Sequence, residues 1–214
     1  MFRKLIMFML PFCIMTGIAS AEMLTNRGFE TGDTTGWTEN VAGGTLTVVS
    51  SQARTGTYSL EIDSTGAGAW ASPNVFQGFA ASPGQEFNMQ GYMLRPASYE
   101  PTDISFGLFK IEFLDVASVI LEPASISIGT GAAAPYYGVE SVPHCDIGSA
   151  ADTWIFSEAQ GVAPAGTVLV NLYALNVNQA LTPGAFYYDD ISATPEPATI
   201  ALLGLGGLFL RRRK

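Results

Sequence analysis

Between its two ends, this chain shows no long run of apolar residues at helical spacing. It holds short runs rich in β-branched and aromatic residues, and Gly, Pro, Asn and Asp separate these runs. Residues 45–49 and 58–62 alternate polar with apolar side chains, as a strand with one buried face does. Many short strands divided by turn residues are typical of a β-sandwich or barrel. The sequence therefore predicts one all-β domain of eight or nine strands.

Residues 104–114 form the clearest predicted strand, because Phe109, Ile111 and Phe113 fall on one face of it. We expect that face to lie in the core. The opposite face holds Phe106, Leu108, Lys110, Glu112 and Leu114. The other expected strands lie at residues 87–94, 116–121, 125–128, 154–156, 168–175 and 186–191. Residues 129–152 are the longest irregular stretch, and such a loop is usually functional or disordered.

The amino-terminal end has the features of a secretory signal. A basic start precedes an apolar run at residues 5–18, and Ala19-Ser20-Ala21 gives the small-x-small pattern that signal peptidase recognises. The run is about 14 residues, whereas a membrane span needs about 20. We therefore expect residues 1–21 to be a signal peptide cleaved after Ala21. The alternative is an uncleaved membrane anchor.

The carboxyl-terminal end has three parts in order. Pro195-Glu196-Pro197 precedes an apolar run at residues 198–210, and Arg211-Arg212-Arg213-Lys214 ends the chain. As a helix, the run would be roughly 20 Å long, shorter than the hydrocarbon layer of about 30 Å. The basic cluster should stay cytoplasmic. We therefore expect residues 22–194 to lie outside the inner membrane.

These three parts resemble the PEP-CTERM sorting tail. The resemblance implies that an exosortase recognises and cleaves residues 194–214 at the inner membrane, where the tail anchors the chain transiently. It also implies a Gram-negative bacterium that makes extracellular polysaccharide, with the protein at the cell surface or in the extracellular matrix, as in a biofilm. An ordinary C-terminal anchor is the alternative.

The domain between the two signals is strongly acidic. It holds four basic residues against eighteen acidic ones, which is a formal charge of −14. A nucleic-acid partner is excluded, because contact with phosphates needs a basic surface. An acidic surface suits divalent cations and neutral partners such as sugars. Anionic polysaccharide could bind only through bridging cations.

Six short motifs, in order, resemble carbohydrate-binding modules of the galactose-binding-like jelly roll, families four, nine and twenty-two. They lie at residues 26–37, 55–60, 83–87, 113–115, 154–166 and 186–191. The resemblance implies a jelly-roll β-sandwich over residues 22–193. The motifs are more specific for the fold than for sugar binding, because many domains of this fold bind no known sugar.

The same resemblance implies a structural Ca²⁺ ion. Its ligands would be Glu30 with Asp189 or Asp190, and Asp33 or Thr57 could contribute. Clustered carboxylates repel one another unless a cation neutralises them. The alternative is that Asp189 and Asp190 straddle a strand, so that one of them is merely solvated.

Sugar binding in such modules uses aromatic rings that stack on pyranose faces, flanked by amides and carboxylates. Trp70 is the best candidate for an exposed platform, with a capped sheet edge as the alternative. Tyr92 and Gln90 share one face of the strand at 87–94, which we interpret as the binding sheet. Further candidates are Tyr99, Tyr136, Tyr137 and Tyr173. We expect Trp37 and Trp154 to be structural.

No catalytic motif is evident. Neighbouring His144 and Cys145 point their side chains apart, which is poor geometry for a nucleophile and its base. Metal-ligand spacings, a Gly-x-Ser-x-Gly elbow and a phosphate loop are missing from the sequence. A glycoside hydrolase needs only two carboxylates, so it stays a lesser alternative.

Cys145 is the only cysteine that remains after loss of the signal, so no internal disulfide forms. We expect it to be buried and inert, with an intermolecular link as the alternative. The sequence thus predicts an exported, non-catalytic surface or matrix protein that binds extracellular polysaccharide. The alternative is a structural or adhesive matrix protein without a defined glycan ligand.

Overall fold

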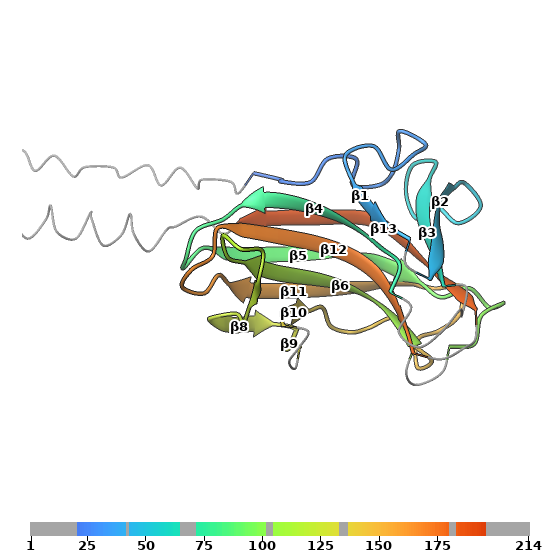
Figure 1. The fold of residues 1–214 in the computed structure, drawn as a ribbon. Helices are drawn as coiled ribbons and strands as arrows, with labels where there is room; N and C mark the ends of the chain where they lie inside the picture. Colours follow the sequence, from blue (N-terminus) through green and yellow to red (C-terminus); the bar gives the residue numbers. More distant parts are fainter. Residues whose placement is uncertain are drawn as a thin grey trace, which may run out of the picture.

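A computed structural model describes residues 21–41, 43–64, 72–101, 105–132, 137–179 and 183–195. These residues form a β-sandwich of two antiparallel sheets (Figure 1). Residues 1–20 of the predicted signal peptide and the part of the sorting tail after Pro195 lie outside the described residues. Within the described ranges, the chain contains no helix with the length and hydropathy needed to cross a membrane.

The first sheet, sheet A, has the strand order β1-β4-β12-β6-β10-β9, and β7 pairs with β6. Its strands are β1 (Thr38–Asn40), β4 (Asn74–Ala80), β6 (Ser105–Leu114), β7 (Ile120–Leu121), β9 (Thr130–Gly131), β10 (Val139–Glu140) and β12 (Leu169–Asn178). The long strands β4, β12 and β6 lie side by side at its centre, although they are far apart in the sequence (Figure 1).

The second sheet, sheet B, has the order β2-β3-β13-β5-β11-β8. Its strands are β2 (Gly44–Val49), β3 (Ser59–Ser64), β5 (Glu86–Leu94), β8 (Ser125–Ile128), β11 (Trp154–Val162) and β13 (Gly184–Pro195). The predicted all-β sandwich is confirmed. The alternation at residues 45–49, 58–62 and 87–94 marks β2, β3 and β5, all of which belong to sheet B.

Two parts of the strand prediction were incomplete. The sequence pattern did not reveal β4, because Asn74, Gln77 and Gly78 are residues that strands disfavour or use rarely. The stretch at 129–152 is not a single long loop, since it contributes β9, β10 and a bridge between Gly107 and Cys145. That stretch therefore adds an edge to sheet A.

The core lies between the sheets and is rich in aromatic rings. Phe109, Ile111 and Phe113 of β6 are fully buried, which confirms the predicted core face. Phe113 meets Phe87 of sheet B at 5.9 Å between ring centroids, and Phe109 meets Tyr188 at 5.8 Å. Burying one such side chain contributes about 1.5–3 kcal/mol, so these cross-sheet contacts hold the two layers together.

Trp37 and Cys145 have structural roles, as predicted. Trp37 stacks on Phe29 at 5.6 Å and is nearly buried. Cys145 is a free, fully buried cysteine, and burial raises the pKa of its thiol to about 12. A thiol with that pKa stays protonated and unreactive. His144 points the other way and stacks on Phe106 at 4.7 Å.

Candidate functional site

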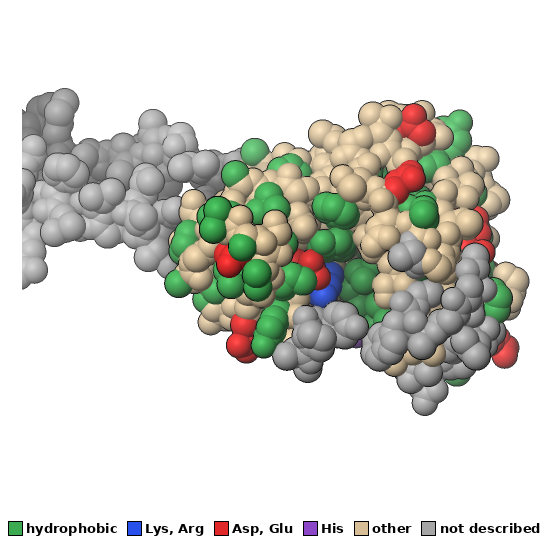
Figure 2. All heavy atoms as spheres, in the orientation of Figure 1, with side chains coloured by type: hydrophobic (Ala, Val, Ile, Leu, Met, Phe, Trp, Pro, Cys, Tyr) green, Lys and Arg blue, Asp and Glu red, His purple; other side chains and the backbone are tan. Residues whose placement is uncertain are grey.

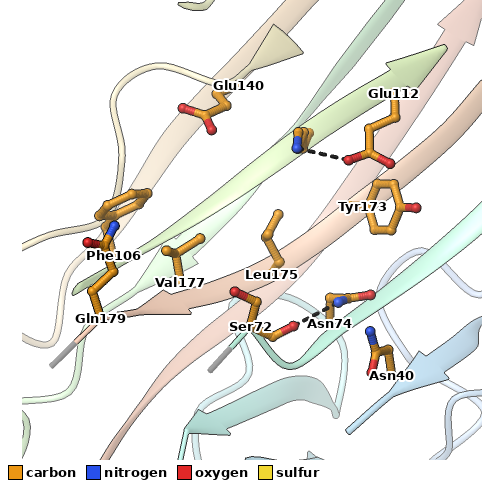
Figure 3. Close-up of a pocket in the computed structure, with 11 residues that line it drawn as sticks. Asn40, Ser72, Asn74, Phe106, Glu112, Glu140, Tyr173, Leu175, Val177 and Gln179 are labelled. Carbon is orange, nitrogen blue, oxygen red and sulfur yellow. Dashed lines mark hydrogen bonds and ion pairs between the residues drawn. The ribbon is translucent and has the colours of Figure 1, made fainter. Parts of the chain in front are cut away.

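The outer face of sheet A is hollowed into a groove that crosses β4, β12, β6 and β10 (Figures 2 and 3). Its volume is about 430 Å³. It is lined by Asn40, Ser72, Asn74, Phe106, Lys110, Glu112, Glu140, Tyr173, Leu175, Val177 and Gln179. Neighbouring strands lie about 4.8 Å apart, so three spacings make the groove roughly 14 Å wide from β4 to β10.

An ion pair forms the floor of the groove. Lys110 and Glu112 lie two residues apart on β6, so they point to the same face of the sheet. Lys110 Nζ lies 2.8 Å from Glu112 Oε1, and both side chains are almost buried (Figure 3). Burying two charges is costly unless they are paired, which the short contact achieves. The ion pair therefore holds the Lys110 ammonium and the Glu112 carboxylate in fixed positions on a floor that is otherwise largely apolar.

Aromatic rings lie at opposite sides of the groove (Figure 3). Tyr173 of β12 packs against Phe76 at 5.0 Å between ring centroids, and Asn171 donates a hydrogen bond to its hydroxyl at 3.1 Å. Burial and the charge of Glu112 raise the pKa of Tyr173, which stays neutral. Phe106 is held on the other side by its stacking on His144. Both rings are thus fixed by neighbours, as a stacking platform requires.

Side-chain amides supply the polar part of the walls. Asn74 donates to the carbonyl of Ser72 at 2.8 Å, while its buried Oδ1 atom accepts no hydrogen bond from the described residues. Gln179 lies near Phe106 (Figure 3). Rings for stacking together with amides and carboxylates for hydrogen bonds form a surface that suits a polyhydroxylated, ring-shaped ligand.

The structure places most of the predicted sugar-binding residues away from this groove. Tyr92 and Gln90 lie on β5 in sheet B, and the Arg54 guanidinium covers the Tyr92 ring at 3.3 Å from its centroid. Tyr137 is half-buried just before β10, and Tyr99 is buried against Phe186.

Trp70 and Tyr136 lie outside the described residues. Of the sequence candidates whose positions the structure describes, only Tyr173 lines the groove. Phe106, Lys110 and Glu112 were not proposed as binding residues from the sequence. Their signal was present, however, because they share the face of β6 that was expected to point away from the core.

A second cavity, of about 370 Å³, lies beside the predicted calcium ligands. Glu30, Asp189 and Asp190 converge around Gly28, as the resemblance implied. A Cβ atom at Gly28 would lie 3.2 Å from Asp189 Oδ1, 3.7 Å from Glu30 Cγ and 4.0 Å from Asp190 Oδ1. A side chain at Gly28 would thus press on Asp189 Oδ1, while its other two contacts are ordinary van der Waals distances.

The chain already supplies donors to each carboxylate. Glu30 accepts the backbone N–H groups of Thr57 and Tyr58 at 3.0 Å. Asp190 accepts the Thr55 hydroxyl at 2.6 Å and pairs with Arg54 at 2.5 Å. The strand register shifts after Asp189, and Asp190 has a positive φ of 49°. This bulge turns Asp190 toward residues 54–55, so it is not merely solvated.

Asp189 is the fully buried member of the cluster. Its Oδ2 atom accepts the N–H groups of Arg54 at 2.8 Å and Thr55 at 3.2 Å. Burial raises the pKa of Asp189 to about 6 despite these hydrogen bonds.

The oxygen donors of the cluster suit calcium in chemistry. Among the residues with described positions, no three His, Cys, Asp or Glu side chains are arranged to hold one ion. Backbone or water oxygens would therefore have to complete such a site.

Two family models match the chain. Residues 21–110 match the model of a carbohydrate binding domain, CBM_4_9, and residues 193–214 match the PEP-CTERM protein-sorting motif. Both resemblances stated from the sequence are thus confirmed. No protein with a curated description matches the chain.

Solved structures with the same fold include carbohydrate-binding modules. The tandem CBM22-1–CBM22-2 domain of Paenibacillus barcinonensis Xyn10C matches with 19% identity and a TM-score of 0.57, over 83% of this chain and 46% of that one. The xylan-binding domain CBM22-1 of the same protein matches with 18% identity and a TM-score of 0.52, over 79% and 91%.

The enzymatically active domain of bacteriophage CBA120 tailspike protein 4 also matches, with 15% identity and a TM-score of 0.56. That match covers 81% of this chain, which spans only 21% of the tailspike chain. At these identities the matches show a shared β-sandwich fold. The two family models support an exported protein that binds polysaccharide.

Proposed function

We propose that this chain is a non-catalytic surface or matrix protein whose β-sandwich binds extracellular polysaccharide in the groove on sheet A. The observation that carries the proposal is the groove itself, which places two fixed aromatic rings beside amides and carboxylates on one sheet. Tyr173 and Phe106 would stack on pyranose faces, and Asn74 and Gln179 would hydrogen-bond the hydroxyl groups.

The chemistry of the groove supports binding without hydrolysis. A glycoside hydrolase needs one carboxyl group that donates a proton and a second that acts as base or nucleophile. Glu112 is held by Lys110 at 2.8 Å, and Glu140 faces His144 at 3.8 Å. Among the described lining residues, Glu112 is therefore engaged in an ion pair and only Glu140 is left without a close partner, whereas hydrolysis needs two available carboxyl groups.

The two ends of the chain would control where the domain works. Signal peptidase would cleave after Ala21, and an exosortase would recognise the motif that begins at Pro195. Strand β13 ends at Pro195, which pairs with Phe87 of β5, so the motif starts at the last described residue of the sandwich. The chain would be anchored transiently in the inner membrane before it reaches the surface or the matrix.

We also propose that the cluster beside Gly28 holds a structural Ca²⁺ ion. Glu30 with Asp189 or Asp190 would supply its carboxylate ligands, and backbone or water oxygens would complete the site. The ion would supply positive charge to a fully buried Asp189 and join the amino-terminal loop to the last strand. The cavity of about 370 Å³ that Gly28, Glu30 and Asp190 line supports this proposal.

The test of glycan binding compares two tyrosines on opposite sheets. On a glycan array, the wild-type chain should bind at least one polysaccharide. Tyr173→Ala should weaken that binding at least tenfold, because one ring of the platform is lost. Tyr92→Ala, on sheet B, is the matched control and should bind as the wild type does.

If both variants weaken binding equally, the groove is not the binding site. No binding to any glycan, with the protein present in purified matrix, would favour the structural or adhesive alternative.

A further inference from the structure

The groove carries an acidic side chain that the described part of the protein does not neutralise. Lys110 and Glu112 cancel each other's charge on the floor. Glu140, at the β10 wall, is the remaining charged group among the described lining residues. Its carboxylate is about one quarter exposed, so a ligand in the groove can reach it.

Two described basic side chains lie near Glu140, and neither neutralises it. Lys110, opposite Glu140 on β6, is paired with Glu112, and His144 is the second. The distance from His144 Nε2 to Glu140 Oε2 is 3.8 Å, which is too long for a hydrogen bond. Burial lowers the pKa of His144, although Glu140 and Asp146 oppose the shift. The imidazole is therefore neutral at pH 7, and its buried Nε2 atom carries no hydrogen-bond partner among the described residues.

The other basic side chains of the domain are engaged elsewhere. Arg27 pairs with Glu22 at 3.1 Å, and Arg54 pairs with Asp190 at 2.5 Å. Arg95 donates to the carbonyl of Ser149 at 2.8 Å. Within the described ranges, every basic side chain is therefore engaged elsewhere or neutral, and the charge of Glu140 is open to a cationic group on a ligand.

We propose that the groove selects a glycan that contains amino-sugar units, with a protonated amine on the sugar paired to Glu140. This inference rests on the proposed function, since it names the class of glycan that the same groove takes. Figure 3 shows Glu140 and Phe106 on the same side of the groove. A ring stacked on Phe106 thus has a substituent within reach of Glu140.

The opposite wall also favours a ligand rich in donors. Asn74 is almost buried, and its Oδ1 atom is an acceptor without a partner among the described residues. An amine or a hydroxyl group can donate to it, whereas a carboxylate or sulfate group cannot. An anionic sugar can still donate to Asn74 through a hydroxyl group, but its charge is repelled by Glu140 at the other wall. Neutral sugars can donate to Asn74 but leave Glu140 without a counter-charge.

The test uses three tetrasaccharides with the same β-1,4-linked backbone that differ at carbon 2. They are the glucosamine tetramer, the N-acetylglucosamine tetramer and cellotetraose. Binding to the full chain is measured by calorimetry at about pH 6.5, where the lowered pKa of His144 still leaves it mostly neutral. We expect the glucosamine tetramer to bind at least tenfold more tightly than the other two, and added salt should reduce this preference.

Two variants assign the preference to one side chain. Glu140→Gln keeps the shape of the side chain and removes its charge, so it should bring the three affinities within about threefold of one another. Glu122→Gln makes the same charge change at an exposed position outside the groove and should keep the preference. Melting curves verify that both variants fold.

Each other result overturns the inference. Equal or tighter binding of the acetylated tetramer or cellotetraose would refute amine selection but leave polysaccharide binding intact. A preference that both variants lose equally would reflect the general acidity of the domain rather than Glu140. If none of the three tetramers binds, amine selection is also refuted, and binding of other glycans on the array decides the proposed function separately.

Discussion

The Glu22 side chain holds Ala193, near the opposite end of the described chain. Its Oε1 atom accepts the N–H of Ala193 at 3.0 Å, and the neighbouring N–H of Met23 donates to the carbonyl of Ala193 at 2.9 Å. Ser192 and Arg27 donate to its Oε2 atom at 2.7 and 3.1 Å. If the signal is cleaved after Ala21, the first residue of the mature protein fastens the strand that leads into the sorting motif.

The first prediction concerns this contact. Burial opposes ionisation of Glu22, but its hydrogen bonds together outweigh burial and lower its pKa. A carboxylate with a lowered folded-state pKa stabilises the fold above its unfolded pKa of about 4.5, and this contribution is lost as pH falls through the folded-state pKa. Glu22→Gln should therefore cost about 1 kcal/mol at pH 7, measured by urea unfolding, and little below pH 3. A cost that does not change with pH would contradict this account.

The second prediction concerns calcium. Removal of the ion with a chelator should lower the melting temperature by several degrees, because Asp189 then lies buried without a counter-cation. Asp189→Asn should abolish the response to added Ca²⁺. The response should persist in Asp115→Asn, an acidic residue outside the cluster. An unchanged melting temperature, with no metal found by elemental analysis, would retire the calcium proposal.

The third prediction concerns the ion pair on the floor of the groove. Lys110→Met should destabilise the protein by about 3 kcal/mol, because it leaves the nearly buried Glu112 without a partner. The double variant Lys110→Met, Glu112→Leu should recover most of this loss. Urea unfolding of the wild type and the three variants, including Glu112→Leu alone, measures the coupling. Additive effects would show that the two side chains do not depend on each other.

The fourth prediction concerns packing between the sheets at Gly91. A Cβ atom there would lie 2.7 Å from Phe109 Cζ and 3.2 Å from the Ile191 backbone. Gly91→Ala should cost about 1–3 kcal/mol, because the buried ring of Phe109 cannot move away without strain. Gly131→Ala meets only the end of the Ile126 side chain, which can rotate, so its cost should be below about 1 kcal/mol. Similar costs for the two variants would count against the packing argument.

The fold could be predicted from the sequence because the patterns that indicate it are local. Alternation within residues 104–114 identified the core face of β6, and short motifs in order pointed to the jelly roll. Strand β4 was missed because Asn74 and Gly78 weaken its pattern, and only its place between β1 and β12 makes it a strand.

The groove could not be predicted in the same way. The groove is formed by Asn74, Tyr173, Lys110 and Glu140 on the neighbouring strands β4, β12, β6 and β10. These strands do not follow one another in the sequence, so a local pattern does not show that they are neighbours. Tyr92 and Tyr173 both lie in strands with similar sequence patterns. Those patterns do not show that the groove lies on the sheet of Tyr173, or that Arg54 covers the ring of Tyr92. The carboxylate cluster was predictable, because its three residues belong to the motifs at the two ends of the domain.

The position of β13 has a mechanical consequence. This strand lies between β3 and β5, and the sorting motif begins at its last residue. At its tail end, residues 192–195 pair with β5, whereas β3 pairs only with residues 184–188. A pull on the tail acts along the strand, so the ladder to β5 must shear before the load reaches the ladder to β3. If the tail tethers the domain, tension therefore loads several hydrogen bonds at once rather than opening them one at a time.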